Sequence, residues 1–227
     1  MLLVFTAGIF AQDSLNVTKI GHLTYQEGLS DVWGYKTGST EYAIVGTHDG
    51  FSIVDVTNPA NPTEVYFEPG QNTIWRDAFI YNDHMYGVND AGGGGMVIID
   101  LSPLPSSTNL SSTTFTGSSY PFQTAHNLYI DENGYCYIFG SEYSNGGAIV
   151  LDLNQNPMAP VEVGLWDDYY IHDGTVRGDT LWAAAVYEGY CGIVDVSDKS
   201  NMVEMANFNT PANFTHNVWM SDDNNYA

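Results

Sequence analysis

One polar pair recurs along this chain and carries most of its potential for chemistry: a His or Arg followed by Asp or Asn. The copies are Asp31 alone, Arg76 with Asp77, His126 with Asn127, His172 with Asp173 and His216 with Asn217. The runs that contain them begin 46, 50, 46 and 44 residues apart. Imidazoles, amides and carboxylates gathered in one place could bind a divalent metal or a polar ligand, or supply a general base for hydrolysis.

A second motif indicates the fold that must position these pairs. GFSIVDVTNPANP begins at Gly50 and returns as GMVIIDLSPLP, GAIVLDLNQNPMAP and YCGIVDVSDKS. The central acids of the four copies, Asp55, Asp100, Asp152 and Asp195, lie 45, 52 and 43 residues apart. A period of about 40 to 50 residues is typical of one four-stranded antiparallel blade of a β-propeller. We therefore expect an all-β chain with four complete blades and the start of a fifth, truncated on its C-terminal side.

The repeat also sets the boundaries and strand order of the blades. We expect a single propeller domain over residues 12–227, with blades at about 30–67, 76–117, 126–166 and 172–208, and the next beginning at 216–227. Residues 17–24 resemble the segments that follow each IVDV copy and are expected to form an outer strand that closes the ring. The second and third strands of each blade are nearly continuous apolar runs, which predicts burial on both faces. The Asp that ends each IVDV strand precedes a turn sequence and is predicted to cap turn amides.

In a propeller blade the first strand lines the central channel, and two kinds of loop emerge beside its start. The recurring pairs should therefore meet at one mouth of the channel, together with residues of the loops between the second and third strands: His48, Asp49, Asp90, Glu142 and Glu188. The candidate metal ligands are His126, His172, His216, Asp173, Asp49, Asp90, Glu142 and Glu188, with calcium or zinc as the ion. The structural alternative is that each pair satisfies backbone groups between neighbouring inner strands.

The charge balance limits the partners. The chain has 27 Asp and Glu against 5 Lys and Arg, which argues against nucleic acid or an anionic membrane as the main partner. Cations and neutral polar ligands, such as a glycan or a protein surface, remain compatible with this charge. Cys136 and Cys191 fall at different places in different repeats, so no zinc-type spacing exists, and both a disulfide and two separate buried thiols stay open.

The first eleven residues, MLLVFTAGIFA, form an apolar run that is too short to span a bilayer. They resemble the apolar core and cleavage site of a secretory signal, and an apolar first strand is the alternative. We therefore expect an exported chain, and no transmembrane span is predicted.

The wider arrangement resembles a known family. The IVDV copies followed by NPxxP resemble the LVIVD repeat, and the blocks GTHDGFSIVDVTNPANP, IWRDAFIY, TAHNLYID, YYIHDGTVR and FTHNVW resemble the choice-of-anchor B family of secreted bacterial proteins. The fourth copy departs from the pattern, because DVSDKSNM lacks both prolines. The resemblance implies a β-propeller that is secreted or at the bacterial cell surface, with a possible C-terminal anchor beyond this sequence. It implies no catalytic residues.

Two hypotheses of function follow from these patterns. The first is an exported binding or interaction module for a protein or glycan, with the His, Asp and Asn residues of the channel mouth as its ligand site. The second is an enzyme, a metal-assisted hydrolase or lyase, that uses the same rim residues.

Overall fold

The computed structural model describes residues 17–227 and arranges them as four antiparallel sheets of four strands each. The predicted signal remnant at residues 1–11 lies outside the described range. The first sheet comprises β1 (Leu29–Thr37), β2 (Thr40–Thr47), β3 (Gly50–Asp55) and β4 (Thr63–Pro69). The second comprises β5 (Arg76–Tyr81), β6 (His84–Asn89), β7 (Met96–Asp100) and β8 (Ser111–Phe115).

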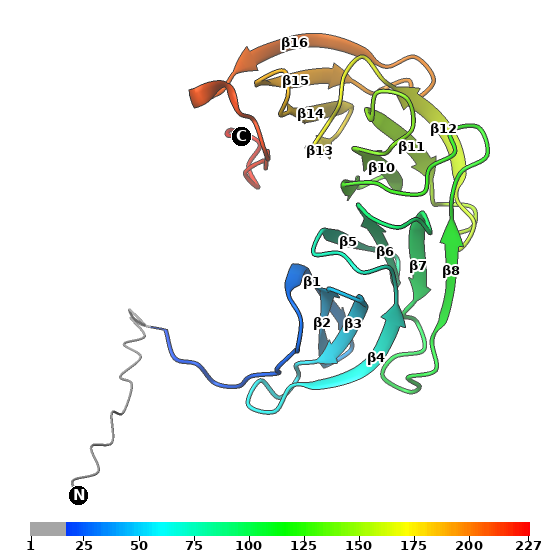
Figure 1. The fold of residues 1–227 in the computed structure, drawn as a ribbon, viewed down its shortest axis with the longest axis vertical. Helices are drawn as coiled ribbons and strands as arrows, with labels where there is room; N and C mark the ends of the chain where they lie inside the picture. The colour runs from blue at the N-terminus through cyan, green and yellow to red at the C-terminus, as the bar shows by residue number, and fades with distance from the viewer. Residues whose placement is uncertain (1–16) are drawn as a thin grey trace, which may run out of the picture.

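The third sheet comprises β9 (Asn127–Ile130), β10 (Tyr135–Phe139), β11 (Ala148–Asp152) and β12 (Val161–Trp166). The fourth comprises β13 (Asp173–Arg177), β14 (Thr180–Ala185), β15 (Tyr190–Asp195) and β16 (Val203–Asn209). In every sheet the strands lie side by side in chain order. Figure 1 shows the sheets as an arc, with the first strand of each toward the centre and the last at the outside. The expected four-stranded blades are confirmed.

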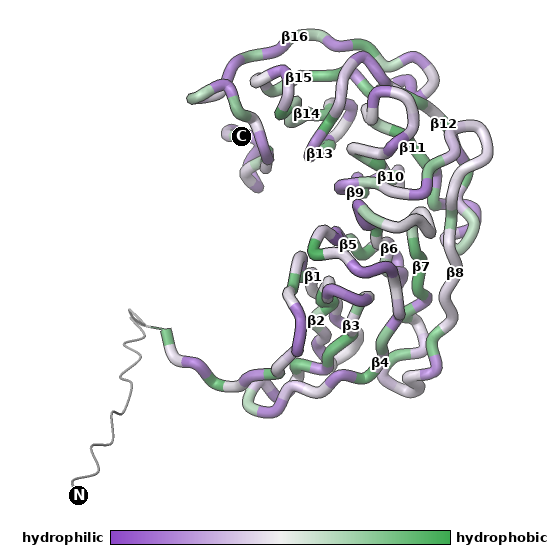
Figure 2. The backbone as a smooth tube through the Cα atoms, viewed as in Figure 1, coloured by the Kyte–Doolittle hydropathy of each residue, from purple (hydrophilic) through white to green (hydrophobic). Residues whose placement is uncertain are grey.

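The blades are held together by hydrophobic clusters that lie between neighbouring sheets. One cluster joins the first and second sheets and includes Ile44, Phe51 and Ile99. Two further clusters join the second sheet to the third and the third to the fourth. Hydrophobic segments run along the inner and middle strands, for example β3 and β7 (Figure 2). The middle strands are buried on both faces, as the continuous apolar runs predict, because each sheet packs against the next.

The repeated Asp of the IVDV motif ends the third strand of each blade and holds the following turn. In all four blades its carboxylate accepts the backbone N–H two residues later, at 2.9 Å: Asp55 from Thr57, Asp100 from Ser102, Asp152 from Asn154 and Asp195 from Ser197. This is the geometry of an Asx turn, in which a side chain replaces a backbone acceptor. The predicted capping role is confirmed.

The two ends of the described chain differ from the expected pattern. Residues 17–24, expected to form an outer strand, carry no ladder and run as extended chain to β1, where the Tyr25 hydroxyl meets that of Ser52 at 2.8 Å. Residues 216–227 form no strand either, although Val218 is buried and its carbonyl accepts the Thr175 hydroxyl of β13 at 2.8 Å. Ring closure by residues 17–24 and a fifth blade stay predictions.

The two cysteines are free thiols, and both are buried. Burial raises the pKa of each, that of Cys191 to about 11. Of the two alternatives that the sequence left open, the structure therefore contains separate buried thiols.

Within the described residues, no helix is long and apolar enough to cross a membrane.

Candidate functional site

The inner strands of the four blades lie beside one another and bring the repeated polar residues to one place. β1 contacts β5, β5 contacts β9, and β9 contacts β13. Side chains two residues apart on a strand point to the same side, so each inner strand aims alternate residues into the channel. The second residue of each recurring pair is one of these: Asp31, Asp77, Asn127, Asp173 and Asn217. We call these five residues the carboxylate-amide layer.

The carboxylate-amide layer surrounds a cavity of about 160 Å³, which we call the channel cavity. All five members line it. A second cavity of about 300 Å³ lies at the rim and is also lined by Asp31 and Asp77, so the two cavities are neighbours at these carboxyls. The structure thus brings together, around one cavity, residues that are separated by up to 186 positions in the chain.

Hydrogen bonds within the layer link neighbouring blades. Asp173 accepts the side-chain amides of Asn127 at 3.0 Å and Asn217 at 2.5 Å through the same oxygen, Oδ2. Asp31 accepts the backbone N–H of Ala78, on the next blade, at 3.1 Å. Among the described residues, no side chain donates a hydrogen bond to Asp77. Among the described residues, the carboxylates of Asp31 and Asp77 therefore both lack a side-chain donor, and Asp173 alone of the three accepts side-chain amides.

The electrostatic environment disfavours negative charge in this cavity. Burial, together with the charges of Asp31 and Asp173, raises the pKa of Asp77 to about 8. Burial also raises the pKa of Asp173 to about 6, although the hydrogen bond from Asn217 acts in the opposite direction. The pKa of Asp31 is raised by burial as well. None of the described residues that line the channel cavity is Lys or Arg.

An aromatic layer lies beside the carboxyls and closes the other side of the channel cavity. It comprises Trp33, Phe79, Tyr129 and Trp219, each two residues after a member of the carboxylate-amide layer. The ring centroids of Trp33 and Phe79 are 4.2 Å apart, those of Phe79 and Tyr129 5.1 Å, and those of Tyr129 and Trp219 6.1 Å. Of Trp33, Trp75, Trp166 and Trp219, the sequence predicts that most lie in the core. The two-residue spacing from Asp31 and Asn217 was the signal that could have placed Trp33 and Trp219 in the channel.

Arg76, the first residue of its pair, has a structural position. It is buried, and its Nε donates to the carbonyl of Thr47 at 2.8 Å. Its Nη2 donates to the carbonyls of His48 and Gln71, and its guanidinium lies 5.4 Å from the Phe51 ring centroid. Burial lowers its pKa. Arg76 of the second blade thus hydrogen-bonds to backbone carbonyls at and after the ends of the first blade's strands. This agrees with the structural alternative, in which the recurring pairs satisfy backbone groups between neighbouring blades.

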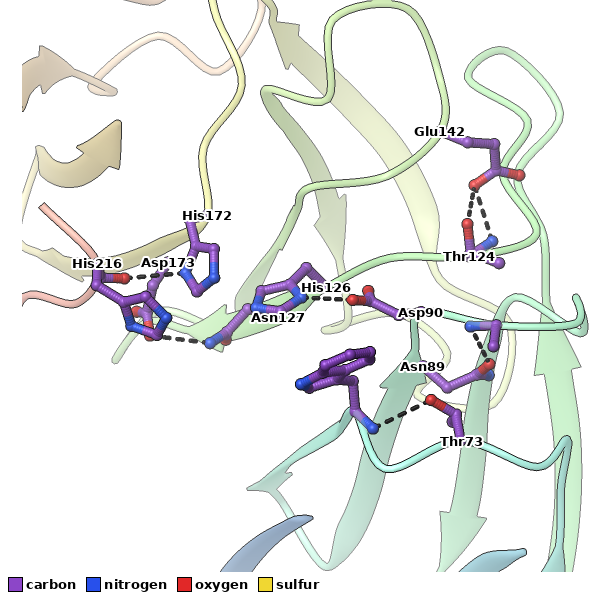
Figure 3. A network of polar contacts seen from close by, with 12 residues as sticks. Thr73, Asn89, Asp90, Thr124, His126, Asn127, Glu142, His172, Asp173 and His216 are labelled. Carbon is purple, nitrogen blue, oxygen red and sulfur yellow. Dashed lines mark hydrogen bonds and ion pairs between the residues drawn. The ribbon is translucent and has the colours of Figure 1, made fainter. Parts of the chain in front are cut away.

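The three histidines form a row of tilted rings along the rim. His126 and His172 have ring centroids 4.0 Å apart, and His172 and His216 are also 4.0 Å apart. Figure 3 shows two hydrogen bonds of this row: the His126 Nδ1 meets the Asp90 carboxylate at 2.6 Å, and the His172 Nδ1 meets the His216 carbonyl at 2.9 Å. Burial and the neighbouring imidazoles lower the pKa of His172 to about 4. Near neutral pH His172 is therefore uncharged.

The loop residues expected at the rim have mixed roles. The Glu142 carboxylate accepts the backbone N–H groups of Gln123 and Thr124, and these bonds lower its pKa although burial acts to raise it. Asp49 accepts the Thr47 hydroxyl at 3.0 Å. The carbonyl of His48 accepts the Thr73 N–H at 2.8 Å, and Glu188 is exposed.

A preorganised metal centre does not emerge from the side chains that the structure describes. Over residues 17–227, no group of three or more His, Cys, Asp or Glu is placed to hold a metal ion. Two of the predicted metal ligands are hydrogen-bonded to protein groups instead: the Asp90 carboxylate pairs with His126, and the Glu142 carboxylate accepts a backbone N–H group. Metal binding at this mouth stays a prediction.

Comparisons with known proteins agree with the repeat and the fold. Residues 39–66 and 184–210 match the LVIVD repeat. The chain contains LVIVD repeats. They cover β2, β3 and part of β4 in the first blade, and the end of β14 with β15 and β16 in the fourth. The wider choice-of-anchor B arrangement stays a prediction. No curated protein matches the chain.

Several solved structures are similar in fold. A functionally unknown protein from Desulfotomaculum acetoxidans superposes with a TM-score of 0.65 at 13% identity over 92% of this chain. A candidate 6-phosphogluconolactonase from Bacteroides fragilis gives 0.59 at 14% over 81%, and Kluyveromyces lactis Hsv2 gives 0.56 at 13% over 83%. The chain spans 65%, 55% and 59% of their respective lengths. At these identities the likeness shows the fold alone.

Proposed function

We propose that the chain is a binding module whose ligand enters the channel mouth and contacts the carboxylate-amide layer. The observation that carries this proposal is the convergence of Asp31, Asp77 and Asp173 on one cavity that no Lys or Arg lines. Such an arrangement destabilises the folded chain, because the carboxyls are desolvated and repel one another. Perturbed carboxyls of this kind concentrate at functional sites.

The rim around the cavity supplies further contact surface. Trp75 is 58% exposed and Ile74 is 49% exposed, and both line the rim cavity. The Trp75 backbone N–H is held by the Thr73 hydroxyl at 3.1 Å. An exposed indole beside polar groups suits stacking on a sugar ring or packing against a protein side chain. These features support a protein or glycan ligand.

The test is a defined panel of glycans and peptides, probed with the wild-type chain and with Trp75→Ala and Asp77→Asn variants. Asp179→Asn is the matched control, since Asp179 is exposed in the turn between β13 and β14. We expect at least one binder that both mouth variants weaken and the control does not. A panel whose binders are all insensitive to the mouth variants would contradict the proposal.

A hydrolase is the second candidate, and one observation favours it. His126 is paired with Asp90 at 2.6 Å and lines the rim cavity together with Asp77, whose pKa of about 8 suits a general acid. Turnover of ester substrates that His126→Ala and Asp77→Asn both abolish would support it. Metal assistance is tested by metal analysis after dialysis: stoichiometric metal in the wild type, lost in the double variant His126→Ala with His172→Ala, is the expected result for a metalloenzyme.

Export and a location at the cell surface form a further part of the proposal. They are supported by the apolar run at residues 1–11 and by the resemblance to a secreted family. Cell fractionation of the producing bacterium tests them, and recovery of the full chain in the cytoplasm would contradict them.

A further inference from the structure

The channel cavity combines three features that together define a ligand class. It is small, it carries three carboxyls on one side, and its other side is a wall of aromatic rings. At about 160 Å³ it is below the range of roughly 300 to 1,000 Å³ that is usual for drug-sized ligands. It therefore fits one small group or one side chain rather than a whole sugar ring system.

The two sides of the cavity attract the same kind of group. Carboxylates attract a cation through charge-assisted hydrogen bonds. Aromatic faces attract a cation through the ring quadrupole within about 6 Å of the centroid, and most strongly for Trp. Two of the four aromatic residues are Trp33 and Trp219. A neutral hydroxyl group would gain from neither interaction to the same degree.

The amide geometry adds selectivity for a donor-rich cation. Asn127 and Asn217 donate through Nδ2 to Asp173, and no hydrogen bond within residues 17–227 uses either Oδ1 atom. Asp77 likewise has no side-chain donor among the described residues. Acceptors therefore outnumber donors around the cavity. An ammonium group supplies three N–H donors and no acceptor.

We propose that the channel cavity binds an alkylammonium group, seated between the carboxylate-amide layer and the aromatic layer. The proposal rests on the proposed binding function and names the ligand chemistry of that same site. The group could belong to a free primary amine or to the lysine side chain of a protein partner. The chain's own five Lys and Arg do not fill the site, since none of them lines the cavity.

Ligand binding should depend on the protonation of the layer. The titratable and charged groups near Asp77 are Asp31 on β1, Asp173 on β13, His126 before β9, and Arg76 on its own strand. Ionised carboxyls bind a cation best, and the raised pKa of Asp77 means that the ammonium displaces a proton. Binding is therefore measured at pH 8.5, where the carboxyls are largely ionised and an alkylammonium, with a pKa near about 10.4, is still charged.

The experiment is isothermal titration of the 227-residue chain with n-butylammonium chloride, with 1-butanol as the neutral analogue. We expect binding of the amine and at least about tenfold weaker binding of the alcohol. Asp77→Asn and Asp173→Asn should each weaken amine binding about tenfold, the effect of losing one charge-assisted hydrogen bond. Asn fits this position, because two copies of the repeat already carry it. Trp33→Leu should weaken binding, and Asp179→Asn should leave it unchanged.

Two further arms separate the possible outcomes. Binding of Nα-acetyl-lysine N-methylamide as tight as that of butylammonium supports a lysine side chain as the source, and much weaker binding supports a free amine. Equal binding of amine and alcohol, or unchanged amine affinity in Asp77→Asn, overturns the alkylammonium proposal. If the glycan and peptide panel still yields mouth-dependent binders in that case, the binding function stands. If neither experiment shows mouth-dependent binding, both proposals fail.

Discussion

Replacing Asp77 with Asn should make the folded chain more stable, by an amount that grows with pH. The pKa of Asp77 is raised to about 8 in the folded protein, against an ordinary value of 3.8. Between these two values the folded chain holds a proton that the unfolded chain has released. The stability of the wild type therefore falls as pH rises from about 4 to about 8, and it is unaffected by this group at lower pH.

The slope follows from linkage. A difference of one bound proton changes the free energy of unfolding by about 1.4 kcal/mol per pH unit. The protonation of Asp77 should therefore lower the free energy of unfolding of the wild type by about 4 kcal/mol between pH 4 and pH 7. This is a large share of the roughly 5 to 15 kcal/mol that usually holds a domain folded. The Asn variant lacks this titration. Its advantage should be small at pH 4 and approach about 4 kcal/mol at pH 7.

The assay is urea unfolding, followed by tryptophan fluorescence, of the wild type, Asp77→Asn and the control Asp179→Asn at pH 4.5, 6, 7.5 and 9. We expect the free energies of unfolding of wild type and Asp77→Asn to diverge from pH 4.5 to 7.5 and then to run parallel. The control should follow the wild type throughout. A difference that is constant over pH, or an Asn variant that is less stable at pH 9, would refute the electrostatic account of the channel cavity.

Three further predictions concern the packing of the blades. Glu162 of β12 accepts the N–H groups of Ser118, Ser119 and Tyr120 from the neighbouring blade, so Glu162→Gln should cost about 1 kcal/mol in urea unfolding at pH 6. Burial acts to raise the pKa of Glu162, but the hydrogen bonds from these N–H groups lower it. The stability loss in Glu162→Gln should therefore shrink as pH falls below about 4, where the wild-type carboxylate becomes protonated. A loss that does not change with pH would argue against a role for the ionised carboxylate. Asp152→Ala should cost about 1 kcal/mol by removing the cap on the Asn154 N–H, with Asp152→Asn milder; equal losses would contradict the capping account. The buried thiols of Cys136 and Cys191 should resist a thiol reagent in native buffer and both react in urea, and rapid native labelling would show that the blade interfaces open readily.

The blades could be predicted from the sequence because their determinants are local. An apolar run that ends in Asp and is followed by a turn sequence specifies a buried strand and an Asx turn without reference to the rest of the chain. The period then counts the blades, and the convergence of Asp31, Asp77 and Asp173 follows from their common position on the inner strands. These parts of the fold and of the candidate site needed no long-range information.

Other parts depend on contacts through space that a motif does not contain. Arg76 and His126 occupy the same position in the repeat, yet Arg76 clips backbone carbonyls while His126 pairs with Asp90, because the loops opposite them differ. The aromatic layer could have been predicted from the alternation of side chains along a strand, because each of its members lies two residues after a member of the carboxylate-amide layer. Trp, however, is usually assigned to a core. Residues 17–24 resemble an outer strand in composition, and composition does not supply the neighbouring edge with which a strand must pair.

The division of the core into clusters between neighbouring sheets also has a consequence for motion. Each of these clusters joins two neighbouring sheets, so the second and third sheets each pack against a cluster on both faces. The first and the fourth sheet each pack against such a cluster on one face only. Amide hydrogen exchange should therefore be graded along the arc, slowest in β6 and β10 and faster in β2 and β14. Local unfolding would begin at the first and fourth sheets and proceed to the second and third, one interface at a time. Cooperativity would then act between neighbouring sheets rather than over the whole fold at once.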